Sequence, residues 1–268
     1  MRTRRQPLGR PAILAIQLAL VAGIVSWWQF GPVDELLWSR PSKALPRAVE
    51  LWHGVMGLPP LWRQISDTVL ATFVGLLSGG GLGFVLGVIL AEFTAVRLTL
   101  TPFLAASNAV PRVAWVPVLT LLFGFGFMTK IVMSGLIVFL VVFFNVLDAA
   151  VHAPPTLIDG VRALGGGYGH RMRDVRVWSS VGAVVASLPN AIAFALVGVV
   201  FAESLSAESG LGALMFNAMQ RGHPEDLVIS AVALGIIGLA LIAATRAIQH
   251  AFADRLMLAD ADAGVSRP

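Results

Sequence analysis

Six long apolar runs, separated by short polar segments, dominate the sequence. At about 1.5 Å per helical residue, each run can cross a hydrocarbon core of about 30 Å. The pattern therefore predicts an all-α membrane protein with about six transmembrane helices, which places both termini on the same side. The expected spans cover residues 12–30, 69–93, 101–123, 131–151, 181–201 and 227–247.

The first apolar run follows a cluster of arginines, as the apolar part of a secretory signal does. It lacks an obvious small-residue cleavage site and ends in Trp27 and Trp28, and tryptophans suit a membrane interface. We therefore expect a retained anchor, followed by a proline-rich loop over 31–46 and a short amphipathic helix over 47–56. The chain then divides into an anchor and outer loop over 1–61, a transmembrane domain over 62–253, and a cytoplasmic tail over 254–268 that we expect to end in disorder from residue 259.

Composition supports a membrane location, since 57% of the residues are hydrophobic and 13% are charged, against about 25% charged in soluble domains. With the N-terminus inside, twelve arginines and lysines fall on the inner side and six on the outer side. The positive-inside rule then predicts cytoplasmic termini. The excess of 19 Lys+Arg over 15 Asp+Glu forms no basic stripe interleaved with aromatics, so we expect no nucleic-acid partner.

Several kinds of chemistry are not indicated by the sequence. It contains no cysteine, and its five histidines show no metal-ligand spacing. No nucleophile–base pair and no phosphate-binding Walker motif is present. We therefore expect no catalytic residue, metal or cofactor in this chain.

A polar stretch, TLIDGVRALGGGYGHRMRDV over 156–175, lies between the fourth and fifth runs. Thr156 followed by Asp159 has the spacing of a capping box, which predicts a helix over 157–164 that ends at Gly165. Leu157, Val161 and Leu164 would share one apolar face. So short a helix is not stable alone, so its face needs a cover, either the chain's own spans or a soluble partner.

Glycines recur every four residues along the second run, at Gly75, Gly79, Gly83 and Gly87. This small-residue row allows another helix to approach closely. The row predicts a helix-packing face whose neighbour belongs to the same chain or to a second copy.

The third and fifth runs carry polar groups and prolines at membrane depth. Pro111 and Pro117 interrupt backbone hydrogen bonding, with Arg112 between them and Asn108 nearby. Arg112 either faces a water-filled path, where it favours an anion or pairs with an acid such as Glu203, or snorkels from a helix end. Glu203, at the end of the fifth run, is either an interface residue or a gate or ion-pair residue.

Three segments together resemble the permease subunit of bacterial ABC importers, in the nitrate, sulfonate and taurine branch. The first is the proline-containing third run followed by an F-G-x-G-x-x-T-K loop at Phe123, Gly124, Gly126, Thr129 and Lys130. The second is similar to the importer coupling loop, at Gly160, Val161, Arg162, Ala163, Leu164 and Gly165. The third is an acid followed by G-L-G, at Glu203, Gly210, Leu211 and Gly212. One departure is that Val177 and Trp178 stand where the family usually has a Leu-Pro pair.

The resemblance implies a mechanism and partners. Two permease copies, as a homodimer, would form the solute path in the lipid bilayer, and two ATP-binding subunits, holding ATP and Mg, would each grip a coupling helix. A periplasmic or lipid-anchored binding protein would deliver a small anion or small organic solute. The coupling residues would be Leu157, Asp159, Gly160, Val161, Arg162, Ala163, Leu164 and Gly165, and the path or gate residues Asn108, Pro111, Arg112, Pro117 and Glu203.

Two other classes remain open from the sequence. An ion-coupled secondary transporter would more naturally show inverted repeats with unwound segments in both halves, and the sequence shows none. A membrane scaffold without transport activity is supported by little beyond the glycine row.

Overall fold

The computed structural model describes residues 10–32, 39–206 and 209–262, and these residues form helices without a β-strand. The all-α prediction is confirmed. In chain order the elements are α1 (Arg10–Phe30), α2 (Pro41–His53), α3 (Leu61–Glu92), α4 (Thr94–Ala109), the 3-10 turn η1 (Arg112–Ala114), α5 (Trp115–Phe123), α6 (Phe127–Val151), α7 (Pro155–Ala163), α8 (Tyr168–His170), the π-helix η2 (Arg171–Val177), α9 (Trp178–Ser206), α10 (Leu211–Arg221) and α11 (Pro224–Asp262).

The expected spans can be compared with the helices of the described residues. Within the described residues, four helices are long and apolar enough to cross a membrane, and they lie in α3, α6, α9 and α11. The third apolar run, which its prolines predict to be interrupted, is indeed broken, because α4 and α5 meet at a bend of 88°. If that bent pair is counted as one span, the total is five. Helix α1, whose described apolar part is Ala15–Phe30, covers the first expected span.

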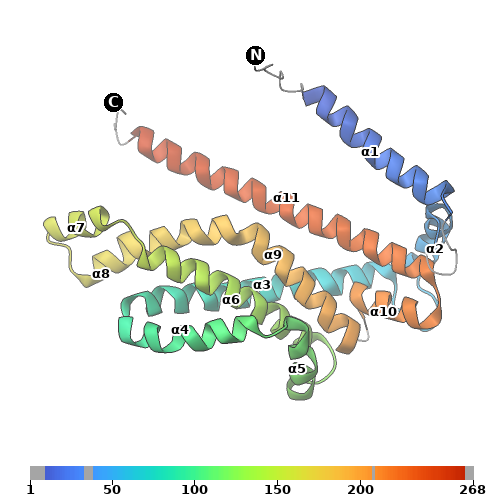
Figure 1. The fold of residues 1–268 in the computed structure, drawn as a ribbon, viewed down its shortest axis with the longest axis horizontal. Coiled ribbons are helices and arrows are strands. Elements are labelled where there is room, and N and C mark those ends of the chain that lie inside the picture. Colours follow the sequence, from blue (N-terminus) through green and yellow to red (C-terminus); the bar gives the residue numbers. More distant parts are fainter. Residues whose placement is uncertain (1–9, 33–38, 207–208, 263–268) are drawn as a thin grey trace, which may run out of the picture.

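The centre of the molecule is a bundle in which α6 lies between α3 and α9 (Figure 1). All four glycines of the row are buried on α3, and they face α6 of the same chain. A Cβ on Gly79 would lie 2.7 Å from the carbonyl carbon of Gly135 and 2.8 Å from its Cα. A Cβ on Gly87 would lie 2.7 Å from Cγ1 of Val146. The backbones of α3 and α6 therefore approach closely because these side chains are missing.

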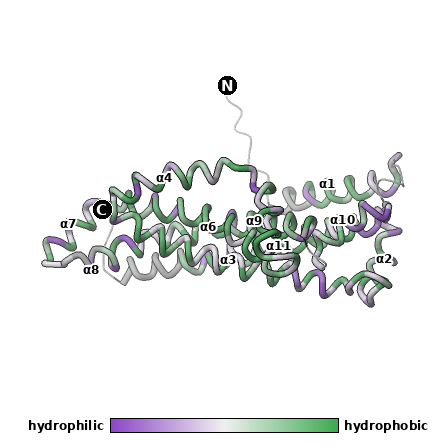
Figure 2. Tube along the Cα trace, turned by 90° about the horizontal axis from the view of Figure 1, so that it is seen from below, coloured by the Kyte–Doolittle hydropathy of each residue, from purple (hydrophilic) through white to green (hydrophobic). Residues whose placement is uncertain are grey.

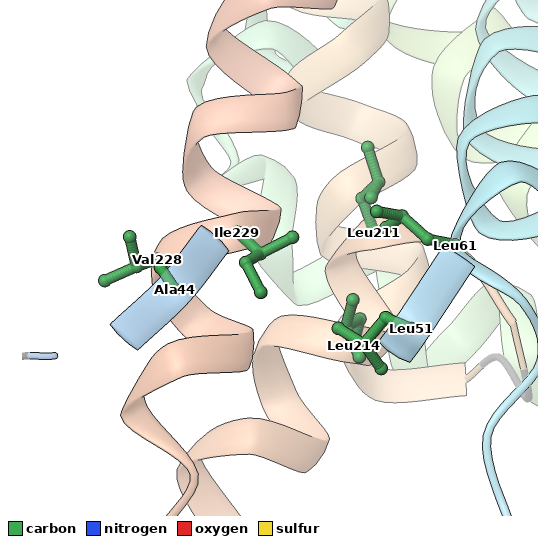
Figure 3. Close-up of a cluster of buried hydrophobic side chains, with 7 residues drawn as sticks. All are labelled: Ala44, Leu51, Leu61, Leu211, Leu214, Val228 and Ile229. Carbon is green, nitrogen blue, oxygen red and sulfur yellow. The ribbon is translucent and has the colours of Figure 1, made fainter. Parts of the chain in front are cut away.

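A second cluster joins α2, α3, α10 and α11 at the opposite end of the bundle from α7 (Figures 1 and 3). Its buried members are Ala44, Leu51, Leu61, Leu211, Leu214, Val228 and Ile229. Arg47 of α2 adds a bidentate pair to the buried Asp226 of α11, with nitrogen–oxygen distances of 2.8 and 3.2 Å. The hydrogen bond to Asp226 raises the pKa of Arg47, so Arg47 stays a cation and its pair with Asp226 holds α2 against α11.

Two predictions near the ends of the chain need correction. The helix expected over 47–56 starts at Pro41, so the expected loop is helical from that residue, since a proline is well tolerated in the first helical turn. The tail expected to be disordered from residue 259 continues α11 to Asp262. Its last residues, 263–268, and residues 33–38 of the outer loop lie outside the described part. Hydropathy agrees with this layout, because apolar colour covers the long helices and much of the polar colour lies towards the α7 and α2 ends (Figure 2).

Candidate functional site

Helix α7 projects at one end of the bundle, beyond the ends of α3 and α6 (Figure 1). It begins at Pro155, with Pro154 as its N-cap and no side-chain cap hydrogen bond. The predicted capping box at Thr156 is therefore wrong. Proline at the first position replaces it, because its fixed φ suits a helix start and its missing N–H has no partner there in any case.

The end of α7 is close to the prediction. Leu164 is the C-cap, and Gly165 follows with a φ of +77°. The Gly165 N–H donates to the Arg162 carbonyl at 2.9 Å, and the Gly166 N–H donates to the Val161 carbonyl at 2.8 Å. These two bonds form a Schellman motif, which satisfies the last carbonyls of the helix and needs glycine at the left-handed position. The glycine cluster therefore ends α7.

The surface of α7 is apolar and uncovered in this chain. Leu157 is 54% exposed and Leu164 is 90% exposed, whereas Val161 is half-buried. Arg162 and Asp159 form an exposed pair at 3.1 Å, one turn apart. The sequence left open whether this apolar face packs on the chain's own spans or on a soluble partner. The chain's own spans do not bury Leu164.

The bend between α4 and α5 places Arg112 beside the middle of α9. The helix breaks at Val110 and Pro111, and the guanidinium carbon of Arg112 lies 4.4 Å from the centre of the Phe194 ring. Pro117 does not break the backbone, because it lies in the first turn of α5, where its missing N–H costs little. The backbone at Asn108 belongs to α4, next to the bend.

Glu203 lies in a buried polar cluster with Lys130 and Thr68. The side chain of Glu203 is fully buried, and its Oε1 lies 3.3 Å from the Lys130 ammonium, which is itself 2% exposed. The Thr68 hydroxyl is 2.8 and 3.0 Å from the two carboxylate oxygens. The Gly212 N–H donates to Oε2 at 2.9 Å. Lys130, rather than Arg112, is thus the cationic partner of Glu203.

The same cluster fixes the start of α10. Lys130 donates to the Ser209 carbonyl at 2.6 Å, and the Leu211 N–H donates to the Thr68 hydroxyl at 3.0 Å. Gly210 has a φ of +117°, and a Cβ there would lie 2.6 Å from Oε2 of Glu203. The cluster therefore connects α3, α6, α9 and α10, and Gly210 leaves room for the carboxylate.

The loop between α5 and α6 delivers Lys130 to this cluster. Gly124 and Gly126 have φ values of +79° and +125°, which glycine adopts readily. The Thr129 hydroxyl donates to the Gly124 carbonyl at 2.6 Å, closing the turn just before the lysine. Each named position of the F-G-x-G-x-x-T-K segment from Gly124 onward thus has a structural role.

Sequence reasoning missed the role of Lys130 and the participation of Thr68. Lys130 is one of the six cations that the sequence analysis assigns to the outer side, yet it is buried and paired, so it does not bear on membrane orientation. A lysine at the start of a long apolar run is the signal that could have identified it, because such a charge needs a buried acid. Thr68 carries no comparable signal.

A sequence profile of the binding-protein-dependent transport system inner membrane component family matches residues 83–258. The chain belongs to this family. The match covers every element from α4 to α10, together with residues 83–92 of α3 and most of α11.

Curated relatives agree with the family. A probable ABC transporter permease of Haemophilus influenzae is 29% identical over 72% of this chain and 78% of its own length. The riboflavin transport permease RibX of Chloroflexus aurantiacus is 29% identical over 94% of this chain and 89% of its own length. The taurine transport permease TauC of Escherichia coli is 23% identical over 92% of this chain and 90% of its own length. A chain of the inward-facing MetNI methionine ABC transporter superposes with a TM-score of 0.63 at 20% identity, over 71% of this chain and 95% of that chain.

Family membership decides among the classes that the sequence left open. The chain is a multi-pass permease of the bacterial inner membrane and is not itself an enzyme. The secondary transporter and the scaffold are set aside. Within the described residues, no group of three or more histidines and acids is placed to hold a metal ion.

Proposed function

We propose that this permease forms one half of the solute path of an ATP-driven importer and that α7 is the surface gripped by the ATPase subunit. The observation that carries this proposal is the exposed apolar face of α7, with Leu164 90% exposed at the end of the bundle. A fully exposed leucine gains roughly 1.5–3 kcal/mol when a partner buries it. The pair Arg162–Asp159 beside it offers polar contacts at the rim of the same face.

A second permease copy completes the path in this proposal, and a solute-binding protein docks at the end that carries α2 and α10. That end lies away from α7 (Figure 1), so the two partners do not compete for a surface. The ATPase subunit binds ATP in the cytoplasm, so the α7 end of the permease faces the cytoplasm in this proposal. Both termini are then cytoplasmic, as the distribution of arginines predicts.

The solute class follows from Arg112. Its guanidinium lies at the bend of the α4–α5 pair, over the ring of Phe194. A cation at membrane depth favours a negatively charged group in a water-filled path. A small anion or a small organic solute with an anionic group fits this feature, and the relatives named for taurine and aliphatic sulfonate transport carry such solutes.

The sequence left Glu203 open as an interface residue or as a gate or ion-pair residue, and the buried Glu203–Lys130 pair supports the ion-pair role. Because the side chains of Glu203 and Lys130 are 0% and 2% exposed, neither faces a path in this conformation. We assign the pair to holding the α10 end of the bundle together while the α7 end moves.

The docking proposal is tested by producing the permease with its ATPase subunit and purifying the complex by a tag on the permease. Leu164→Asp should lose most of the ATPase subunit, because docking would bury an unpaired carboxylate. Met56→Asp is the matched control, since Met56 is 98% exposed in the loop between α2 and α3. Equal recovery of the ATPase subunit with both variants would refute docking at α7.

A further inference from the structure

Arg176 joins the entrance of α9 to the ends of two other helices. It lies in η2, and its Nε is 2.6 Å from Oε1 of Glu92, the last residue of α3. Its Nη1 is 3.0 Å from the Ala91 carbonyl and 3.5 Å from the Ala150 carbonyl, near the ends of α3 and α6. One guanidinium thus contacts the last turns of two helices that point their negative dipole ends towards it.

This contact has the features of a strong one. The side chains of Arg176 and Glu92 are 20% and 15% exposed, so solvent screens the pair less than it would an exposed pair. The carbonyls at a helix end have no partner inside the helix, and Arg176 supplies one to each of them. A lysine could not make the same set of contacts, because it lacks the planar fork of the guanidinium.

The neighbours of η2 show what the contact connects. Helix α7 packs on η2 more than on any other element. On the other side, Val175 is buried, and Met172 and Val177 pack on a cluster that contains Val138 of α6 and Ala195 of α9. The segment η2 therefore lies between the coupling surface and the bundle core.

We propose that Arg176 is a positioning residue that holds η2 to the ends of α3 and α6, so that movement of α7 reaches the end of α3 through a direct contact. The chain itself joins α7 to α6 through residues 152–154 and to α9 through η2. Without Arg176, the end of α3 would lose its contact with η2 at Glu92 and Ala91. This inference rests on the proposed docking of the ATPase subunit at α7.

The absence of cysteine makes a site-specific test direct. Single cysteines at Thr156, in the first turn of α7, and at Thr99, on the exposed surface of α4 beyond Glu92, would carry an environment-sensitive fluorophore. Each labelled permease is assembled with its ATPase subunit in lipid nanodiscs. The signal is the fluorescence change on adding ATP with Mg, and no solute is needed.

In the parent protein both fluorophores should respond to ATP. In Arg176→Gln the Thr156 fluorophore should keep its response, whereas the Thr99 fluorophore should lose most of its own. Arg97→Gln is the matched control, because Arg97 donates to the same Ala91 carbonyl, at 3.4 Å, but from α4. It should leave both responses intact.

Glu92→Gln removes the ion pair and leaves both carbonyl contacts, and it should also weaken the Thr99 response. If Arg176→Gln does not assemble with the ATPase subunit, the Thr99 response of Glu92→Gln tests the proposal in its place. An undiminished Thr99 response in these variants would overturn the role of Arg176. A parent protein in which neither fluorophore responds, or which does not retain the ATPase subunit, would instead overturn the proposed function.

Discussion

The glycine row allows the sharpest test of the fold, because three consecutive glycines of α3 have different surroundings. A Cβ at Gly79 would lie 2.7 Å from the backbone carbon and 2.8 Å from the Cα of Gly135. A Cβ at Gly80 would meet side-chain methyl groups at 3.8 and 4.0 Å, and one at Gly81 would have nothing within 4 Å. Substitution by alanine at the three positions therefore adds the same methyl group to one helix in three environments.

The expected changes in stability differ in sign between Gly79→Ala and Gly81→Ala. Overpacking costs about 1–3 kcal/mol where neighbours can shift, and at Gly79 the neighbour is backbone, so we expect the upper end of that range. Alanine is favoured over glycine in a helix by about 0.8–1.0 kcal/mol, which offsets part of the cost at Gly79. At Gly81 this preference acts alone. The two variants should thus differ in stability by about 2 kcal/mol or more.

Thermal unfolding of the purified variants in one detergent measures this difference. Gly79→Ala should melt below the parent protein, Gly81→Ala at or above it, and Gly80→Ala between the two. If Gly79→Ala and Gly81→Ala melt at the same temperature, the close approach of α3 and α6 is not present in the folded protein.

Two further predictions concern the charged groups inside the bundle. Lys130→Met leaves the Glu203 carboxylate buried without its cation and should cost about 3–5 kcal/mol of stability. Combining Lys130→Met with Glu203→Gln should recover much of that stability. If the single and the double variant unfold at the same temperature, the two residues are not coupled. Arg112→Ala should reduce uptake of the solute carried by the co-produced binding protein by about tenfold, as expected for the loss of roughly 1.4 kcal/mol, without reducing recovery of the ATPase subunit. Phe194→Leu, which keeps the charge of Arg112, should reduce uptake less, and normal uptake by Arg112→Ala would favour the snorkelling interpretation.

Hydrophobic periodicity located the long helices well, because a run of apolar residues has few alternatives in a membrane. It did not give the bend between α4 and α5. The polar residues Asn108 and Arg112 and the proline Pro111 interrupt the apolar run there, which indicates a broken helix but not the angle between its two parts. The two prolines also differ in effect: Pro111 follows the end of α4, whereas Pro117 lies within the first turn of α5.

The candidate site was only partly predictable for a related reason. The end of α7 could be read locally, since a glycine with positive φ ends a helix through its own backbone. The buried cluster could not, because Thr68, Lys130 and Glu203 are far apart in the sequence and meet only when α3, α6 and α9 pack. The start of α7 was misread because two mechanisms compete there, a threonine cap and a proline at the first helical position.

The departure at Val177 and Trp178 follows from how η2 joins α9. Both Val177 and Trp178 are helical, and the Trp178 N–H donates to the Val175 carbonyl. A proline at position 178 would remove that donor and disfavour a helical conformation at Val177. With tryptophan there, the chain runs from the π-helix into α9 without a break, so η2 and α9 form one continuous rod. Arg176 lies two residues before Trp178, in the last turn of η2. A helical junction keeps its side chain at a fixed angle to Glu92, and a hinge at Trp178 would not, so we link the absence of the usual Leu-Pro pair in this chain to the contact that Arg176 makes with α3 and α6.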